Sequence, residues 1–414
     1  MKKGLMLSLA ASAVLFAGGD IAPVEPVAEA PAAACDDFYG FAGAGVIYGD
    51  PDVGTDNDEV ATYGAVALLG VNKEIVSGLT VNAELQGGVF QEYIAEDDDR
   101  GPIMEFGALT QLNLGYTWCN TAFKVGRMAV PGSLSPLHYS GTDYFGLKNS
   151  TFEGALVANT DLPDTTIWAA YVRTILTHAT TDNLDVLRDQ GKSKRTGVSL
   201  AAAGLVNKSF ADTVITLAGY YDLTGDDTKD DRALPFTYEI AGSIDKKWCD
   251  TDISIGAAYR TYDAKSFVNS NGDTITTGDY DYMVGAYVVQ HFGKVDAMFA
   301  ATYVADEDSA DDDFARSAGF YNKYVLKTMH GYLNREGWSI GGSLSTDWCG
   351  YKLSAYGMYD QQGDYQAGTG VKKTIAGITF GIDYRYRHHV GDDIDSDQDD
   401  KNSQRLRASA IYNF

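Results

Sequence analysis

The chain ends in the stretch Gln404-Arg-Leu-Arg-Ala-Ser-Ala-Ile-Tyr-Asn-Phe414, in which apolar and polar residues alternate. In an extended strand, one face would carry Leu406, Ala408, Ala410, Tyr412 and Phe414, and the other Arg405, Arg407, Ser409 and Asn413, with Ile411 as the exception. An apolar outer face and an open edge would both promote aggregation of a soluble domain, and a closed membrane barrel removes both problems. We therefore predict that this strand closes a transmembrane β-barrel.

The N-terminus has the pattern of an export signal. Met1-Lys2-Lys3 precedes an apolar run over residues 5–17, which is too short to anchor the chain in a membrane. We assign residues 1–17 to a signal peptide and residues 18–37, which contain three prolines without any period, to a periplasmic arm. Residues 38–414 would then form a single barrel domain.

From Phe38 onward, alternating segments bounded by turn residues recur along the chain. Eighteen strands are expected, at residues 38–48, 60–71, 78–93, 103–117, 121–129, 151–159, 164–174, 196–205, 212–222, 236–246, 251–262, 279–290, 294–304, 337–347, 350–360, 365–374, 377–389 and 404–414. An even number suits a single-chain bacterial barrel, with sixteen strands as the alternative. A strand of eleven residues at a tilt near 40° rises by about 27 Å, close to the apolar band of such barrels. The fold class is thus an all-β, antiparallel transmembrane barrel.

The composition agrees with a transmembrane sheet that has one wet face. The 414 residues include 45 Gly, 27 Tyr and 17 Phe, and the formal net charge is −25. Much of the acidic charge lies in five clusters between strands: Asp50 to Glu59, Glu96 to Asp99, Asp222 to Asp231, Asp306 to Asp313 and Asp392 to Asp400. Such clusters repel a phosphate backbone, so we expect no nucleic-acid partner. They allow weak binding of divalent cations, but no cofactor is expected.

The alternation is clearest between residues 104 and 118. The face that we assign to lipid holds Met104, Phe106, Ala108, Thr110, Leu112, Leu114, Tyr116 and Trp118, and the opposite face is polar. Long acidic connections alternate with short ones along the chain, which is typical of extracellular loops and periplasmic turns.

Three short turns repeat one motif: Trp118-Cys119, Trp248-Cys249 and Trp348-Cys349. Each tryptophan would lie at the membrane interface. With Cys35, all four cysteines would line the periplasmic rim, where disulfides are allowed, although bridging requires Cα atoms within about 7 Å. Disulfides and free thiols both remain open, and no CxxC spacing supports a metal site.

The connection between the fifth and sixth expected strands is rich in proline and nearly uncharged, which favours an inward fold. Val125-Gly126-Arg127 before it, and Phe152-Glu153-Gly154 and Asn159-Thr160-Asp161-Leu162-Pro163 after it, resemble the third-loop region of OprD-like porins, specifically the Opr-family porins of epsilon-class proteobacteria. Phe414 resembles the C-terminal signature of bacterial outer-membrane barrels. The resemblance implies a homotrimeric porin with an inward-folded third loop. The implied pore constriction comprises Arg127, Ser133, Ser135, His138, Tyr139, Asp143, Tyr144 and Glu153.

A second candidate site consists of basic residues in the lumen phase, that is, at the alternate strand positions whose side chains are expected to point into the barrel. The set comprises Lys124, Arg173, Arg260, Lys352, Lys372, Arg385, Arg387, Arg405 and Arg407. Arginine on the lipid face costs about 2 to 4 kcal/mol at the midplane, which favours the lumen. In the resembled family a basic ladder guides carboxylate-bearing solutes. The alternative is that these residues form ion pairs within the wall, with Glu84, Glu105, Glu153, Glu239 or Asp383. Arg127 would need a bulge to turn inward, because Phe123 and Val125 occupy the lipid phase.

Catalysis is not expected. The six histidines show no HExxH spacing, and the segment from Gly197 to Ala201 lacks the second glycine of a nucleophile elbow. The sequence predicts a passive diffusion channel for ions and small hydrophilic solutes in the outer membrane of a Gram-negative cell, with outer-membrane lipid and lipopolysaccharide as neighbours. Two alternatives stay open: a FadL-like transporter of hydrophobic solutes, and a general cation-preferring porin.

Overall fold

The protein is described by a computed structural model over residues 38–49, 60–94, 99–129, 150–177, 194–223, 238–261, 266–268, 274–276, 280–306, 337–389 and 401–414. The expected signal peptide and arm, Cys35, and the constriction positions Ser133, Ser135, His138, Tyr139, Asp143 and Tyr144 lie outside these residues. No helix in the described part is long and apolar enough to cross a membrane.

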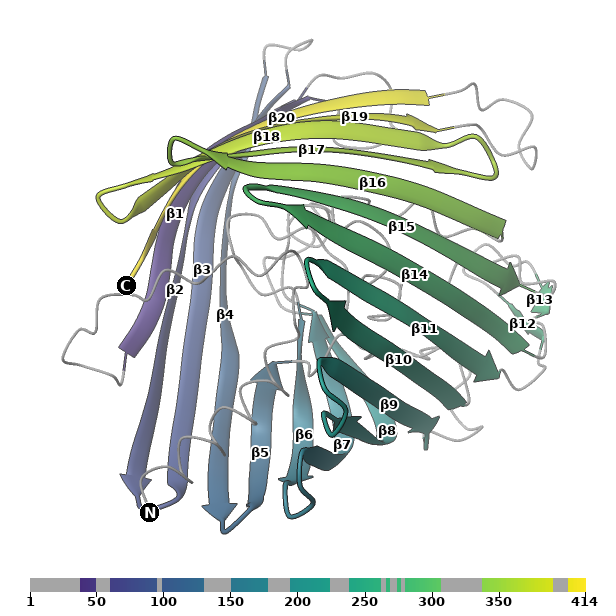
Figure 1. Ribbon diagram of the computed structural model, residues 1–414. Coiled ribbons are helices and arrows are strands. Elements are labelled where there is room, and N and C mark those ends of the chain that lie inside the picture. Colours follow the sequence, from purple (N-terminus) through teal and green to yellow (C-terminus); the bar gives the residue numbers. More distant parts are fainter. Residues whose placement is uncertain are drawn as a thin grey trace.

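The described strands form one closed antiparallel barrel of eighteen strands, as predicted (Figure 1). Its strands are β1 (Phe38–Gly49), β2 (Val60–Val76), β3 (Leu79–Ile94), β4 (Asp99–Trp118), β5 (Thr121–Ala129), β6 (Ser150–Asn159), β7 (Thr165–Thr177), β8 (Lys194–Asn207), β9 (Thr213–Asp222), β10 (Tyr238–Trp248), β11 (Thr251–Thr261), β14 (Tyr280–Phe292), β15 (Val295–Asp306), β16 (Gly337–Trp348), β17 (Tyr351–Asp360), β18 (Tyr365–Ile375), β19 (Ile378–His389) and β20 (Lys401–Asn413). A separate hairpin, β12 (Ser266–Val268) with β13 (Thr274–Thr276), is missing from the prediction because three residues show no period.

The last strand closes the barrel, as the C-terminal sequence predicts. β20 pairs with β1 in a continuous register in which Ala44 faces Ala410, and the two strands lie side by side in Figure 1. The backbone N–H groups of Gly40 and Phe414 donate to each other's carbonyl oxygen at 2.9 and 3.0 Å. A Cβ on Gly40 would lie 2.9 Å from the Phe414 ring, so glycine lets the terminal aromatic lie against β1.

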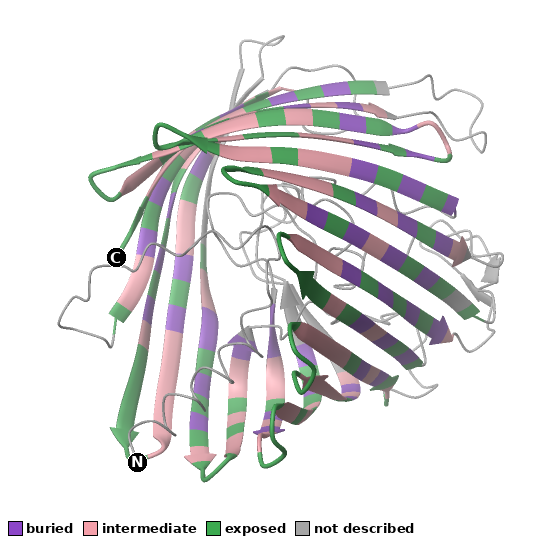
Figure 2. Cartoon of the chain, in the orientation of Figure 1, coloured by how far each residue is buried: buried purple, intermediate pink, exposed green. Residues whose placement is uncertain are grey.

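Buried and exposed residues alternate along the strands (Figure 2). On β11, Ile255 is 56 % exposed on the outward side, while Ser254 and Arg260 are fully buried on the lumen side. The same alternation separates an apolar outer surface from a polar lumen side in β10 and β16. The period of two therefore assigns each strand residue to lipid or lumen.

The face predicted for residues 104–118 is wrong at Thr110. Leu112, Leu114 and Tyr116 are exposed as expected, but the register between β3 and β4 shifts between Glu84 and Leu85, and Thr110 is fully buried. A bulge inserts one residue and reverses the phase of everything before it. Leu109, expected on the lumen face, is therefore opposite the exposed Leu85.

Short turns connect the strands at one rim of the barrel. Trp118, Trp248 and Trp348 are each about two-thirds exposed there, which suits an interfacial belt. In a neighbouring turn, Asn159 and Asn120 donate side-chain hydrogen bonds to the Asp161 carboxylate at 2.7 and 2.8 Å. These bonds hold the pKa of Asp161 below its ordinary value.

The three described cysteines are exposed free thiols on this rim. Their turns connect β4 to β5, β10 to β11 and β16 to β17, so the nearest two turns are four strand spacings apart along the rim. Neighbouring strands lie about 4.8 Å apart, so these thiols are too distant to bridge one another. The structure therefore excludes a disulfide among Cys119, Cys249 and Cys349, which the sequence had left open. Cys35 lies outside the described residues.

Candidate functional site

Four neighbouring strands carry basic side chains in the lumen phase, and we call this set the basic column. It comprises Lys352 on β17, Lys372 on β18, Arg385 and Arg387 on β19, and Arg405 and Arg407 on β20. The outward neighbours Tyr384 and Leu406 are 38 % and 45 % exposed, whereas the lumen-facing Arg385 is 8 % exposed. The two lysines lie near the short-turn rim and Arg387 near the loop end, so the column runs along most of the barrel's height.

Two pairs of like charges meet within the basic column. Lys352 lies directly opposite Lys372, and Arg385 lies directly opposite Arg405. Like charges in this position destabilise a sheet. The stability of the barrel wall therefore does not explain why these positions hold basic residues. Together they give this side of the lumen a concentrated positive charge.

Carboxylates compensate only part of this charge. The Nε atom of Arg407 donates to Asp383 at 2.7 Å, which confirms one ion pair of the alternative interpretation. Asp360 and Asp364 are buried at the loop end of β17 and β18. Asp347 on β16 lies directly opposite Lys352. Six cations thus share this part of the wall with four carboxylates.

Arg260 belongs to the wall rather than to an open ladder. It lies opposite Glu239, both side chains are fully buried, and the Arg260 guanidinium donates to the Glu239 carboxylate. A buried ion pair of this kind fixes its strands in register, but it offers little charge to a passing solute.

The opposite sector of the lumen wall is apolar, and we call it the apolar wall. It comprises Met128, Phe152, Leu156, Val172, Leu200, Ala202, Ala218 and Tyr220 on β5 to β9, with Trp168 and Ala170 packed against them. Phe152 and Leu200 are fully buried. The segment predicted to fold inward joins Ala129 to Ser150, at the edge of this wall, but it lies outside the described residues.

Arg127 and Glu153 lie in the outward phase, contrary to the constriction predicted for them. Arg127 is directly opposite the exposed Leu112, where the register between β4 and β5 ends, and it is also opposite Glu153, where the register between β5 and β6 is continuous. The Nη2 atom of Arg127 donates to Glu153 at 2.7 Å, and Nη1 donates to the Leu109 carbonyl at 2.6 Å. Bulges occur in β4 and β7, whereas the registers show none in β5, so Arg127 keeps the phase of Phe123 and Val125.

Arg173 is a second correction to the pore-lining set. It follows the exposed outward row of Ile167, Ala169 and Tyr171 on β7, and its own side chain is exposed. Val172 pairs with Gly154 in the lumen phase, and a bulge at Arg173 then places Thr174 opposite the outward Glu153. Lys124 keeps the lumen phase, since it alternates with the outward Phe123 and Val125.

Sequence reasoning missed two polar clusters of the lumen wall. Glu84 is buried and accepts hydrogen bonds from Tyr39 at 2.9 Å, Thr110 at 2.6 Å and Gln111 at 3.0 Å. Near the short-turn rim, His291 lies 2.7 Å from Asp296 and 3.1 Å from Asp252. The only signal in the sequence is their alternation, which places these residues on the lumen face. It does not show which of them contact one another across strands.

Metal chemistry has no candidate within the described ranges, where no group of three or more His, Cys, Asp or Glu side chains could hold an ion. The acidic connections, to which weak divalent binding was assigned, lie mostly outside those ranges.

Comparisons with known proteins find likeness in structure alone. No family model matches the chain, and no curated protein matches its sequence. OccK7 (OpdD) of Pseudomonas aeruginosa superposes with a TM-score of 0.62 at 11% identity, covering 91% of this chain and 99% of that one. OccAB1 of Acinetobacter baumannii gives 0.60 at 11% identity, covering 91% and 96%. OccK8 (OprE) of Pseudomonas aeruginosa gives 0.59 at 13%, covering 91% and 98%. These proteins are outer-membrane channels of the OprD/Occ type, and the barrel described here has their fold.

Proposed function

We propose that this barrel is an outer-membrane diffusion channel for small hydrophilic solutes and that it favours solutes bearing a carboxylate. The fold supports the first part, because a closed barrel of eighteen strands encloses more space than its own side chains fill. The observation that carries the second part is the pair of like-charge contacts in the basic column, Lys352 opposite Lys372 and Arg385 opposite Arg405.

An anionic solute would relieve the repulsion in the basic column while it passes. Arginine presents a planar fork of donors that matches a carboxylate. Arg387, two residues beyond Arg385 on the same side of β19, extends the contact toward the loop end. The column runs from the loop end to the short-turn rim. A carboxylate that crosses the barrel can therefore pass from one basic side chain to the next.

The competing proposal is a general channel that prefers cations. Its support is the acidic group near the short-turn rim, where Asp252 and Asp296 face His291, together with the net charge of −25. We favour anion selection because most of the acidic charge belongs to connections that the sequence assigns to the solution outside the barrel, where salt would screen them within about 8 Å. Charges that line the passage act in confined water and are screened less.

A planar-bilayer recording tests the channel itself. Purified protein is expected to give stepwise conductance, and the homotrimer that we predict would give events in groups of three. A silent protein that binds long-chain fatty acids would contradict the proposal and favour the FadL-like transporter. No catalytic role forms part of the proposal.

A further inference from the structure

The outward face of the barrel differs between two sectors near the loop end. From β10 to β19, an aromatic band covers this level, with contacts such as Tyr238 to Tyr259 and Tyr365 to Tyr386 at ring-centroid distances of 6.3 and 5.8 Å. On β5, β6 and β7 the outward positions toward the loops carry Arg127, Glu153 and Arg173 instead. Charges at this level are costly against acyl chains, so this sector needs a polar neighbour.

The three charges do not cancel. Arg127 and Glu153 form a half-buried ion pair, with side chains 22 % and 23 % exposed. Arg173 is exposed and forms no hydrogen bond or ion pair with any residue in the described ranges. Beside it on the same row, the Tyr171 hydroxyl lies 3.2 Å from that of Ser199, also at the surface. One uncompensated guanidinium and two hydroxyl groups therefore face outward together.

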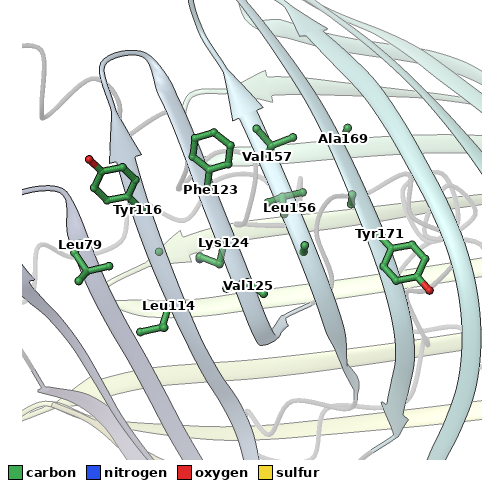
Figure 3. A pocket seen from close by; sticks show the side chains of 13 residues that line it. Leu79, Leu114, Tyr116, Phe123, Lys124, Val125, Leu156, Val157, Ala169 and Tyr171 are labelled. Atoms are coloured by element: carbon green, nitrogen blue, oxygen red, sulfur yellow. The ribbon is translucent and has the colours of Figure 1, made fainter.

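An apolar hollow of about 550 Å³ lies next to these groups on the side of the short turns. Side chains from β3 to β7 line it (Figure 3), among them Leu114, Phe123, Val157 and Tyr171. Its lining includes exposed outward residues such as Val125 and Ala169, so the hollow faces the bilayer. A free cation above an apolar hollow matches an amphiphile that has an anionic head and a long apolar tail.

We propose that this outward face of β5 to β7 binds one phosphorylated glycolipid of the outer leaflet, the lipid A part of lipopolysaccharide. A lipid A phosphate binds the Arg173 guanidinium and the adjoining hydroxyl groups, and an acyl chain occupies the hollow. Phosphate suits the guanidinium fork of Arg173. The leaflet follows from the position of the charges, which lie in the half of the strands nearer the extracellular loops.

A second copy of the chain fits these observations less well. A protein neighbour would be expected to supply a carboxylate to Arg173, and the aromatic band from β10 to β19 offers none among the described residues. Lipid A supplies the anion and the tail in one molecule. The ion pair of Arg127 with Glu153 carries no net charge and would lie beside the lipid A head group, next to Arg173.

Native mass spectrometry of the detergent-solubilised full chain, titrated with purified lipid A, tests the proposal. The expected result is one bound lipid A per barrel, with about tenfold weaker binding after Arg173→Gln, because a charge-assisted contact is lost. Arg173→Lys is expected to restore part of the affinity. Ala169→Trp, which fills the hollow, is expected to remove the adduct.

Matched controls separate the site from the general surface. Lys373→Gln removes an outward-phase cation at the short-turn rim, where its Nζ lies 3.8 Å from the Tyr351 ring centroid, and is expected to leave binding unchanged. Ala257→Trp adds a tryptophan to an exposed outward position of β11 and is likewise expected to have no effect. Heat-modifiable gel mobility confirms that each variant is folded, and Arg173→Gln alone decides the test if Ala169→Trp does not fold.

Three results would overturn the proposal. One is equal loss of lipid A in Arg173→Gln and Lys373→Gln. Another is displacement of lipid A by inorganic phosphate, or binding of phosphatidylglycerol with the same affinity, which would leave only an anion or general lipid contact. The third is a species with two or more copies that Arg173→Gln dissociates, which would identify the face as a subunit interface.

Discussion

The apolar wall and the basic column are built in the same way and differ in what they contribute. Both occupy the lumen phase of neighbouring antiparallel strands, on β5 to β9 and on β17 to β20. The apolar wall buries Phe152 and Leu200 completely, so it gains stability from packing. In the basic column, Arg385 lies directly opposite Arg405, and this contact between like charges adds no stability. The comparison indicates that stability and selectivity reside in different sectors of one barrel.

The largest expected effect on stability comes from the buried ion pair beside the apolar wall. Arg260→Ala leaves Glu239 buried without its charge partner, which is expected to lower the free energy of unfolding by about 4 kcal/mol. Urea unfolding of the barrel in lipid vesicles measures it. The double replacement Glu239→Leu with Arg260→Met is the control and is expected to recover most of the loss. An equal loss in both variants would show that the strands need the charges themselves.

A substitution in the apolar wall is expected to have the next largest effect. Leu200→Ala removes a fully buried side chain and should lower the free energy of unfolding by about 3 kcal/mol. The same unfolding experiment measures it, and the reversal potential in a salt gradient should not change. A shift in selectivity would mean that the apolar wall also governs the passage, and the contrast between the sectors would fail.

The basic column is expected to respond in the opposite sense. Arg405→Gln removes the like charge opposite Arg385 and should raise the free energy of unfolding by up to about 1 kcal/mol. The same variant should shift the reversal potential toward cations. A clear loss of stability would show that Arg405 serves the wall, as Arg407 does through Asp383.

The smallest effect is expected for the exposed lysine pair. Lys372→Gln should change the free energy of unfolding by less than about 0.5 kcal/mol, because both Lys352 and Lys372 are exposed to the lumen. It should shift the reversal potential in the same direction as Arg405→Gln, but by less. A larger shift than that of Arg405→Gln would move the selective part of the column to the short-turn rim.

Much of the fold follows from the sequence because a barrel strand repeats one simple rule. The alternation ending at Phe414 predicts both the closing strand and its lipid face, and β20 pairs with β1 as expected. The prediction fails where the rule is interrupted. The bulge at Thr110 leaves no mark in the residue pattern, so residues before it were assigned to the wrong face.

The candidate site was less predictable, because alternation along a strand shows which face a side chain lies on but not which residue on the next strand it contacts. Phase puts Arg385, Arg387 and Arg405 on the lumen side, where the structure also has them. Arg173 was placed in the lumen on its charge, and Arg127 in the constriction on a family resemblance against its phase. The pairing of Arg260 with Glu239 depends on the register between β10 and β11, which the sequence leaves open. The cross-strand contacts at Glu84 depend on register in the same way.

The central claim is that charges in the passage, rather than the charge of the whole chain, set selectivity. It is tested most directly by reversal potentials of two variants in the same salt gradient. Arg385→Gln with Arg387→Gln removes two charges of the basic column, and replacing the six aspartates between Asp392 and Asp400 by asparagine neutralises a loop. We predict that the first variant shifts the reversal potential toward cations far more than the second shifts it toward anions. The opposite ranking would contradict the account and would identify a general cation-preferring porin governed by its mouth.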